Sequence, residues 1–336
     1  MIKEEDFNFS HFELEMLFCL QYRFLKEESE VKNELSVCSM FRSDKVKRTK
    51  ELELKLLKKQ WLREWVEQTK KLLSIKHEYN AAQIKNYLHS SNVSEGKLLA
   101  FIVEVSTFQP YFPFSNNEKK YKDLIFSDYA YLKSAQDFFP AYGNKIVSCK
   151  KLYSDARQEM AKEIAGSSNA LLWVSVAAAS SLFLAPFLGA AIGGLMGLSG
   201  AAATSAGLAF LGGGAIAAGG FGMAGGTVAV MAGGSLVAYA SNNYLYQDMV
   251  KQQDENALLV SCAKLAALIG LMENRKETVK YLCDSARVIQ NDFEDAIDDF
   301  FIDPGKNKEF SVEITEKKIK ILRSFRKFVR TKGGSS

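Results

Sequence analysis

Few residues of this chain are of the types that carry enzyme or metal chemistry, and their spacing does not group them. The histidines are His11, His77 and His89, and none belongs to an H-E-x-x-H motif or to a zinc-type cluster. The nucleophile motif G-x-S-x-G and the phosphate-binding motif G-x-x-x-x-G-K-S/T are also missing. We therefore predict a protein that is not an enzyme and holds no cofactor or metal. An enzyme of unrecognised type would need a cleft that the sequence does not reveal.

The cysteines are odd in number and scattered, and no two of them form a C-x-x-C pair: Cys19, Cys38, Cys149, Cys262 and Cys283. We interpret them as reduced, mostly buried thiols of an intracellular protein. The N-terminal sequence MIKEEDFNFSHFELEML is acidic and lacks the apolar stretch of a secretory signal. We therefore expect synthesis in the cytoplasm without a signal peptide.

Two further patterns resemble ligand sites but each lacks a required part. Residues 220–225, GFGMAG, match the dinucleotide-binding pattern G-x-G-x-x-G, which needs a preceding strand and an acidic residue about 20 positions on. The first acid after them is Asp248, and no alternation of strands and helices surrounds them. The acidic residues within 292–303 lack the D-x-D-x-D-G arrangement of a calcium loop. We interpret these acids as a solvated helix surface or as a partner for basic helices.

The charges are distributed unevenly along the 336 residues. The net charge of +4 is too small to indicate a polyanionic partner, and no nucleic acid is expected. Glu163 and Asp248 are successive charged residues, so the 84 residues between them carry no charge, and 17 of the 23 glycines lie there. The chain therefore divides into an N-terminal region, a charge-free segment, a C-terminal region and a short tail that we interpret as a tag remnant, at 1–163, 164–247, 248–332 and 333–336.

Apolar residues at helical spacing predict helices throughout the two charged regions. Ser10 and Glu13 fit a capping box at the start of the first helix. The second helix, about 45–77, has an apolar face, and its basic residues, Lys58 among them, are expected elsewhere. A basic helix ends the chain, and the other predicted helices cover 81–90, 95–107, 119–139, 144–165, 246–272 and 275–301. Because no sustained period-2 pattern occurs, the predicted fold class is all-α, a bundle of long helices around a central hydrophobic hairpin.

The charge-free segment is long enough to cross a bilayer several times. A span needs about 20 apolar residues, so the segment could supply two long spans, three, or four short ones. Its richest part, Leu171–Leu188, favours insertion by roughly 3–5 kcal/mol, whereas the glycine-rich Phe221–Tyr239 favours it by only roughly 1.5–3 kcal/mol. This small margin indicates conditional insertion. Permanent membrane residence and a buried Ala/Gly-packed hairpin that never meets lipid are the two alternatives.

The glycines of this segment are spaced to form lines along helix faces. They recur every four residues in the first part of the segment and every seven in the second, at Gly189, Gly193, Gly197, Gly212, Gly219, Gly226 and Gly233. Small residues let helix backbones approach closely, which is how helices associate in lipid. We predict that these seven glycines form the helix contacts of a membrane-inserted homo-oligomer. Both charged regions are expected to remain in the cytosol, which requires an even number of crossings.

The last helix is basic and amphipathic. One side carries five cations that could contact lipid headgroups: Lys317, Lys320, Arg323, Lys327 and Arg330. The opposite side is apolar, with Ile321, Leu322, Phe325, Phe328 and Val329. The alternative is a helix that docks onto the bundle by this apolar side.

Long charged helices on either side of an uncharged Gly/Ala-rich hairpin resemble α-helical pore-forming proteins of the cytolysin A type and membrane effectors of bacterial abortive-infection systems. The resemblance implies a soluble form that rearranges, inserts its apolar hairpin into a lipid bilayer, oligomerises and permeabilises the membrane, as a toxin or a cell-defence effector. A regulatory protein partner would fit such a protein. The alternative is a constitutive membrane anchor or scaffold whose cytosolic helices recruit a partner.

Overall fold

The computed structural model describes the chain in these ranges: 9–31, 44–73, 75–108, 110–111, 120–121, 124–176, 255–273, 275–303 and 310–333. All regular elements within them are helices, which confirms the all-α prediction. In chain order the elements are α1 (His11–Ser29), α2 (Asp44–Leu73), α3 (Ala81–Leu88), α4 (Glu95–Ser106), α5 (Asp128–Phe138), the short 3-10 helix η3 (Pro140–Tyr142), α6 (Gly143–Val176), α12 (Glu255–Leu271), α13 (Lys276–Ile302) and α14 (Val312–Gly333).

The predicted capping box starts α1. The backbone N–H of Ser10 donates to Glu13 Oε2 at 2.6 Å, and the N–H of Glu13 donates to Ser10 Oγ at 3.3 Å. These bonds satisfy two backbone donors that the first helical turn leaves open. The capping box is confirmed as the sequence pattern predicts it.

Three helix boundaries differ from the sequence prediction. The helix predicted to end at residue 165, α6, continues to Val176. The second helix ends at Leu73 rather than near residue 77, and residues 75–80 run without helical structure to α3. The helix predicted from residue 119 begins at Asp128, where the Ser127 side chain accepts a hydrogen bond from the N–H of Ala130. The serine cap fixes this start, because it satisfies a backbone donor of the first turn.

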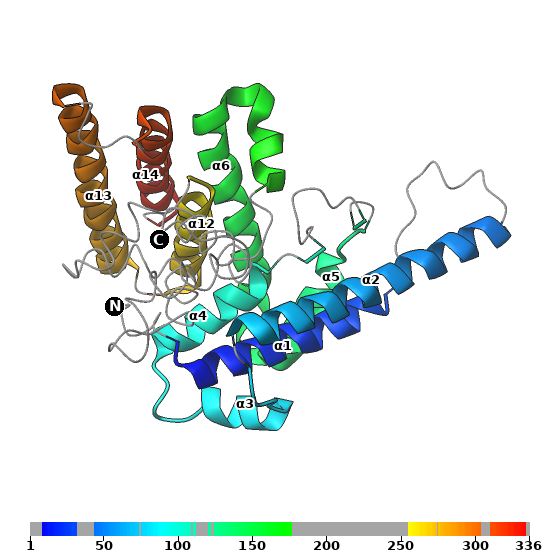
Figure 1. Ribbon diagram of the computed structural model, residues 1–336. Coiled ribbons are helices and arrows are strands. Elements are labelled where there is room, and N and C mark those ends of the chain that lie inside the picture. The colour runs from blue at the N-terminus through cyan, green and yellow to red at the C-terminus, as the bar shows by residue number, and fades with distance from the viewer. Residues whose placement is uncertain are drawn as a thin grey trace.

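Helices α1 to α5 form the first of two groups (Figure 1). Their core is aromatic: Trp61 and Trp65 of α2 are fully buried and stack with ring centroids 6.2 Å apart. Phe18 of α1 stacks on Trp65 at 5.3 Å. Lys58, which we expected away from the apolar face of α2, is only 1% exposed. That expectation was wrong, because Glu28 of α1 lies opposite Lys58 and neutralises it.

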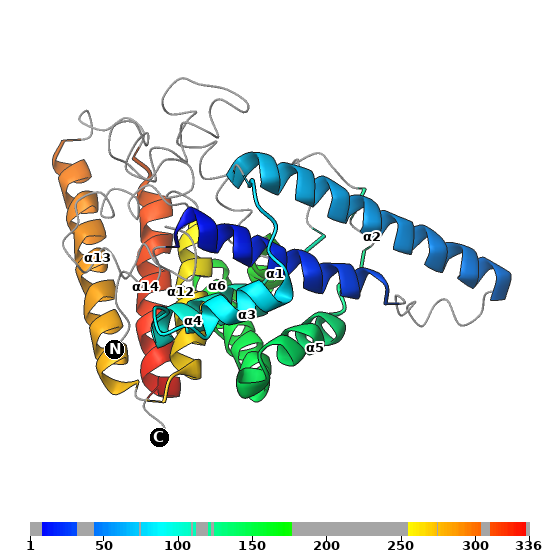
Figure 2. The same ribbon diagram turned by 90° about the horizontal axis from the view of Figure 1, so that it is seen from below.

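Helices α6, α12, α13 and α14 stand side by side as the second group (Figures 1 and 2). α6 and α12 are antiparallel, since Lys145 near the start of α6 pairs with Glu273 just after α12, 3.2 Å between Nζ and Oε1. Gly270 of α12 lies so close to Leu152 of α6 that an added Cβ would stand 2.0 Å from Leu152 Cδ1. A larger residue at this position would require the Leu152 side chain to move.

The apolar side of α14 is packed against the other helices of this group. Ile321, Leu322, Phe325, Phe328 and Val329 are each 2% exposed or less. The structure therefore shows the docked arrangement that we gave as the alternative for this helix.

Candidate functional site at the base of the charge-free segment

The charge-free segment leaves and rejoins the bundle at one end. Its first residues, 164–176, are the last part of α6, and α12 begins at Glu255 soon after the segment closes. Because α6 and α12 are antiparallel neighbours and α12 is the shorter helix, the start of α12 lies beside the part of α6 where the charge-free segment begins. The two ends of segment 164–247 thus continue into two adjacent helices, on the same side of the bundle.

The end of α13 and the start of α14 lie at the same end of the bundle. The two helices are antiparallel, since Cys283 Sγ lies 3.9 Å from the carbonyl oxygen of Arg326 while Phe293, further along α13, faces Lys318, earlier in α14. The carboxylate of Glu313 raises the pKa of Lys317, and Glu255 at the start of α12 adds to this effect. The start of α12, the end of α13 and the start of α14 therefore lie together near the base of the charge-free segment.

A buried ion pair in the middle of α12 fixes this helix to α4 of the first group. Lys264 is the one charged residue between Asn256 and Met272, and its Nζ donates to Glu104 Oε2 at 2.7 Å. Both residues are 1% exposed. Burial lowers the pKa of Lys264, an effect that the facing carboxylate opposes. Without access to solvent the pair offers no catalysis, and we interpret it as the polar anchor of α12.

The residues predicted to act in the membrane are only partly within the described structure. The seven glycines from Gly189 to Gly233 lie outside the described residues, so their contacts stay a prediction. Within the described ranges, no helix combines the length and the low polarity that crossing a bilayer demands.

The five cations of α14 remain on its outer side. Arg323 pairs with Glu294 of α13 at 2.6 Å, and Lys317 pairs with Glu313 at 2.7 Å. Lys320, Lys327 and Arg330 are exposed. The pair with Glu294 matches the interpretation of the α13 acids as partners of a basic helix. Headgroup contact by the five cations stays a prediction.

Two of the three dispersed histidines converge on a buried carboxylate. His11 Nε2 and His77 Nδ1 lie 3.4 and 3.5 Å from the oxygens of Glu15, which is 2% exposed. Glu15 Oε1 also accepts the backbone N–H groups of Lys76 and His77 at 2.7 and 3.1 Å. Burial disfavours the ionised form, but these hydrogen bonds hold the pKa of Glu15 below its ordinary value. The carboxylate thus ties the chain after α2 to α1, which explains why that helix ends early.

Glu15→Gln is expected to lower the free energy of unfolding by about 1–3 kcal/mol at pH 7, because the amide replaces a charged acceptor of backbone hydrogen bonds. The folded-state pKa lies below the unfolded one, so the stabilisation is present above about pH 4.5 and is lost as the pH falls through the folded value. Urea unfolding at pH 7 and pH 3 measures this, with the largest difference from wild type at pH 7. Glu67→Gln, at an exposed position of α2, is the control, and an equal effect of both variants would refute the role of Glu15.

A third carboxylate, Glu28, collects donors from three separate segments. Its Oε1 accepts from Lys58 Nζ at 2.6 Å and from the N–H of Ser127 at 2.9 Å, and its Oε2 accepts from the hydroxyl of Tyr111. Tyr111 has a φ of 68°, which a tyrosine rarely adopts. The cluster is closed and fully partnered, so its function is to hold these segments together.

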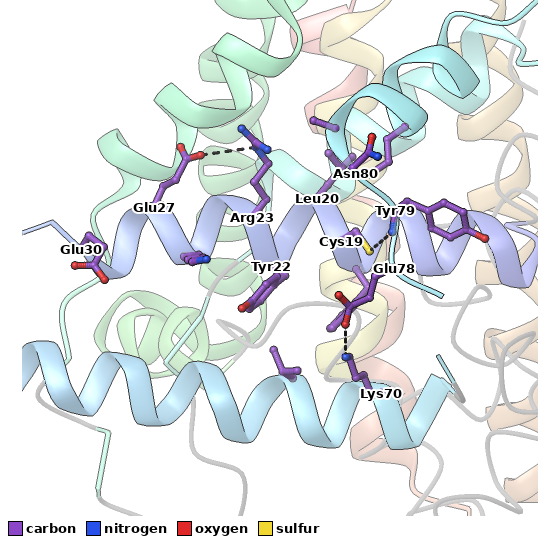
Figure 3. A pocket seen from close by; sticks show the side chains of 15 residues that line it. Cys19, Leu20, Tyr22, Arg23, Glu27, Glu30, Lys70, Glu78, Tyr79 and Asn80 are labelled. Carbon is purple, nitrogen blue, oxygen red and sulfur yellow. Dashed lines mark hydrogen bonds and ion pairs between the residues drawn. The ribbon is translucent and has the colours of Figure 1, made fainter. Parts of the chain in front are cut away.

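An open groove of about 750 Å³ lies between α1, the end of α2 and the start of α3 (Figure 3). Its charged side chains are largely paired with one another, as Lys70 with Glu78 at 2.5 Å. The thiol of Cys19 accepts the N–H of Tyr79 at 3.3 Å, and burial raises its pKa. A thiol with a raised pKa is a poor nucleophile at neutral pH. The groove therefore presents no catalytic set.

The described cysteines agree with the prediction of reduced, mostly buried thiols. Cys19, Cys149, Cys262 and Cys283 are free thiols and the last three are buried, whereas Cys38 lies outside the described residues. In the described part of the chain, no group of three or more histidine, cysteine or acidic residues could hold a metal ion.

Comparison of the chain with models of known families, with curated proteins and with solved structures gives no match. The resemblance to pore-forming proteins and membrane effectors therefore stays an expectation from the sequence. A function has to be inferred from the residues and the geometry of the chain itself.

Proposed function

We propose that this protein is not an enzyme and that it permeabilises membranes by inserting its charge-free segment, residues 164–247. The observation that carries the proposal is the position of this segment. It consists of 84 residues without a charge. It connects two adjacent antiparallel helices at one end of the bundle. Such a segment can enter a bilayer while both of its ends stay on one side.

The geometry of the base supports an even number of crossings. α6 leads into the segment and the adjacent α12 leads out of it, so a hairpin or two hairpins return the chain to its starting side. An odd number would require α12 to leave α6, and that would break the buried pair of Lys264 with Glu104. The bundle therefore favours insertion of hairpins over a single span.

The described core supports a segment that can move without unfolding the bundle. Buried apolar residues of α6 reach from Ile146 to Ala161, and those of α12 reach from Leu258 to Leu271. These contacts lie on the bundle side of both junctions. Insertion of residues after 176 therefore leaves this part of the core in place.

A leakage assay tests the proposal. The purified chain is added to vesicles loaded with a self-quenched dye, made of zwitterionic or of anionic lipid, at pH 7 and pH 5. We expect release of most of the dye and sedimentation of the protein with the vesicles under at least one of these conditions. Intact vesicles and protein left in the supernatant under all four would contradict the proposal. Recovery of the protein from cells only in carbonate-resistant membranes would favour the constitutive anchor instead.

A further inference from the structure

The last turns of α13 carry an exposed surface that is both apolar and acidic. Phe301 and Ile302 are 67% and 81% exposed, and the neighbouring Asp295, Asp298 and Asp299 are exposed as well. Within the ranges that the structure describes, these three aspartates make no ion pair, whereas Glu294 beside them binds Arg323. Negative charge at a helix C-terminus opposes the helix dipole. A partner that brings positive charge would relieve this cost.

A surface of opposite charge lies on the outer half of α2. Leu52 and Leu56 are 60% and 58% exposed, and helical spacing puts Lys55, Lys59 and Arg63 on the same face. Lys55 and Lys59 share a single carboxylate, that of Glu30, at 2.5 and 2.7 Å. The face therefore keeps a net positive charge. The sequence of residues 44–50 adds four basic residues and one acid.

The two surfaces cannot meet within one molecule. The first turns of α2 and the last turns of α13 lie at opposite ends of the protein in both views (Figures 1 and 2). We propose that the α2 surface of one copy of this chain binds the α13 surface of a second copy. Leu52 and Leu56 then cover Phe301 and Ile302, and the basic side chains face the three aspartates.

This contact is heterologous, because each copy uses one surface and leaves the other free. Such a contact grows into a chain or closes into a ring, rather than stopping at a symmetric dimer. An anionic lipid surface would repel the aspartates, which favours a protein partner over a membrane for the α13 surface. The contact does not depend on the membrane activity.

Sedimentation velocity of the full chain without lipid tests the contact. We expect species larger than the monomer that grow with protein concentration and shrink as salt screens the charges. L52S/L56S and F301S/I302S are each expected to sediment as monomers, with association weakened about tenfold or more. Mixed in equal amounts, the two variants are expected to form a heterodimer and nothing larger, because the mixture holds one intact pair of surfaces per dimer.

Tyr129→Ser is the matched control, because Tyr129 is 80% exposed on α5 outside both surfaces, and this variant should associate like wild type. Circular dichroism of all variants should be unchanged, since the replaced side chains are exposed. A wild-type chain that stays monomeric at about 100 µM, where contacts of modest area associate, would overturn the proposal. So would variants that associate normally or a mixture that yields only monomers. The leakage assay is independent of these results, because it depends on residues outside both surfaces.

Discussion

Glu104→Gln is expected to lower the free energy of unfolding by about 3–5 kcal/mol, because it leaves Lys264 buried without a counter-charge. The two residues are 1% exposed, and Nζ and Oε2 are 2.7 Å apart. Glutamine keeps the size of the side chain and one hydrogen-bond acceptor. The loss of unfolding free energy therefore measures the contribution of the charge. Urea unfolding at pH 7 followed by circular dichroism measures it.

Two controls separate the charge from the packing. The double variant E104L/K264M removes both charges together, and we expect it to recover most of the lost stability, since apolar residues can replace a buried pair at little cost. Asp137→Asn breaks the exposed pair with Lys133 and should cost less than about 1 kcal/mol. A Glu104→Gln variant as stable as Asp137→Asn would show that the pair does not anchor α12.

The anchor also bears on how the molecule works. α12 begins at Glu255, eight residues after the charge-free segment ends at residue 247, and apart from Lys264 it carries no charge from Asn256 to Met272. An apolar helix of this kind could follow the segment towards lipid. The pair with Glu104 opposes this, because breaking it would move an unpaired cation away from its buried carboxylate partner on α4. The pair thus holds α12 in the part of the molecule that stays in place.

The local pattern of the sequence predicted the helices well, because apolar spacing and caps depend on neighbouring residues. Ser10 and Glu13 form the predicted capping box, and α3, α4 and α13 end within a few residues of the predicted positions. The end of α2 was missed since it depends on Glu15, about 60 residues earlier, which captures the N–H groups of Lys76 and His77. Tertiary contacts of this kind leave no trace in local spacing.

The polar core was harder to predict than the helices. Lys58 lies four residues after Leu54 and three before Trp61, so helical spacing alone places it on the apolar face of α2. Its partner Glu28 could not be identified, because it comes from another helix. The same holds for Glu104 and Lys264, which are 160 residues apart. A single sequence shows where a charge is out of place but not what neutralises it.

Gly219→Leu and Gly226→Leu are each expected to reduce dye release from vesicles at least tenfold while leaving the bundle folded. Both glycines belong to the seven-residue series from Gly212 to Gly233 in the charge-free segment. If that series forms the contact face of inserted helices, a leucine on it holds neighbouring backbones apart. The described core lies outside the segment, so the circular dichroism and the unfolding midpoint should not change.

Comparison of vesicle binding with dye release in the leucine variants distinguishes a role of the glycines in helix contacts from a role in membrane insertion. Leucine favours transfer into the bilayer by about 0.5 kcal/mol relative to a neutral residue, so these variants should bind vesicles at least as well as wild type. Loss of leakage with full binding therefore identifies the glycines as contact residues rather than insertion signals. Ala224→Leu is the control, since five residues after Gly219 a helix presents its opposite side. We expect this variant to release dye like wild type, and equal release by all three leucine variants would exclude the glycine contacts.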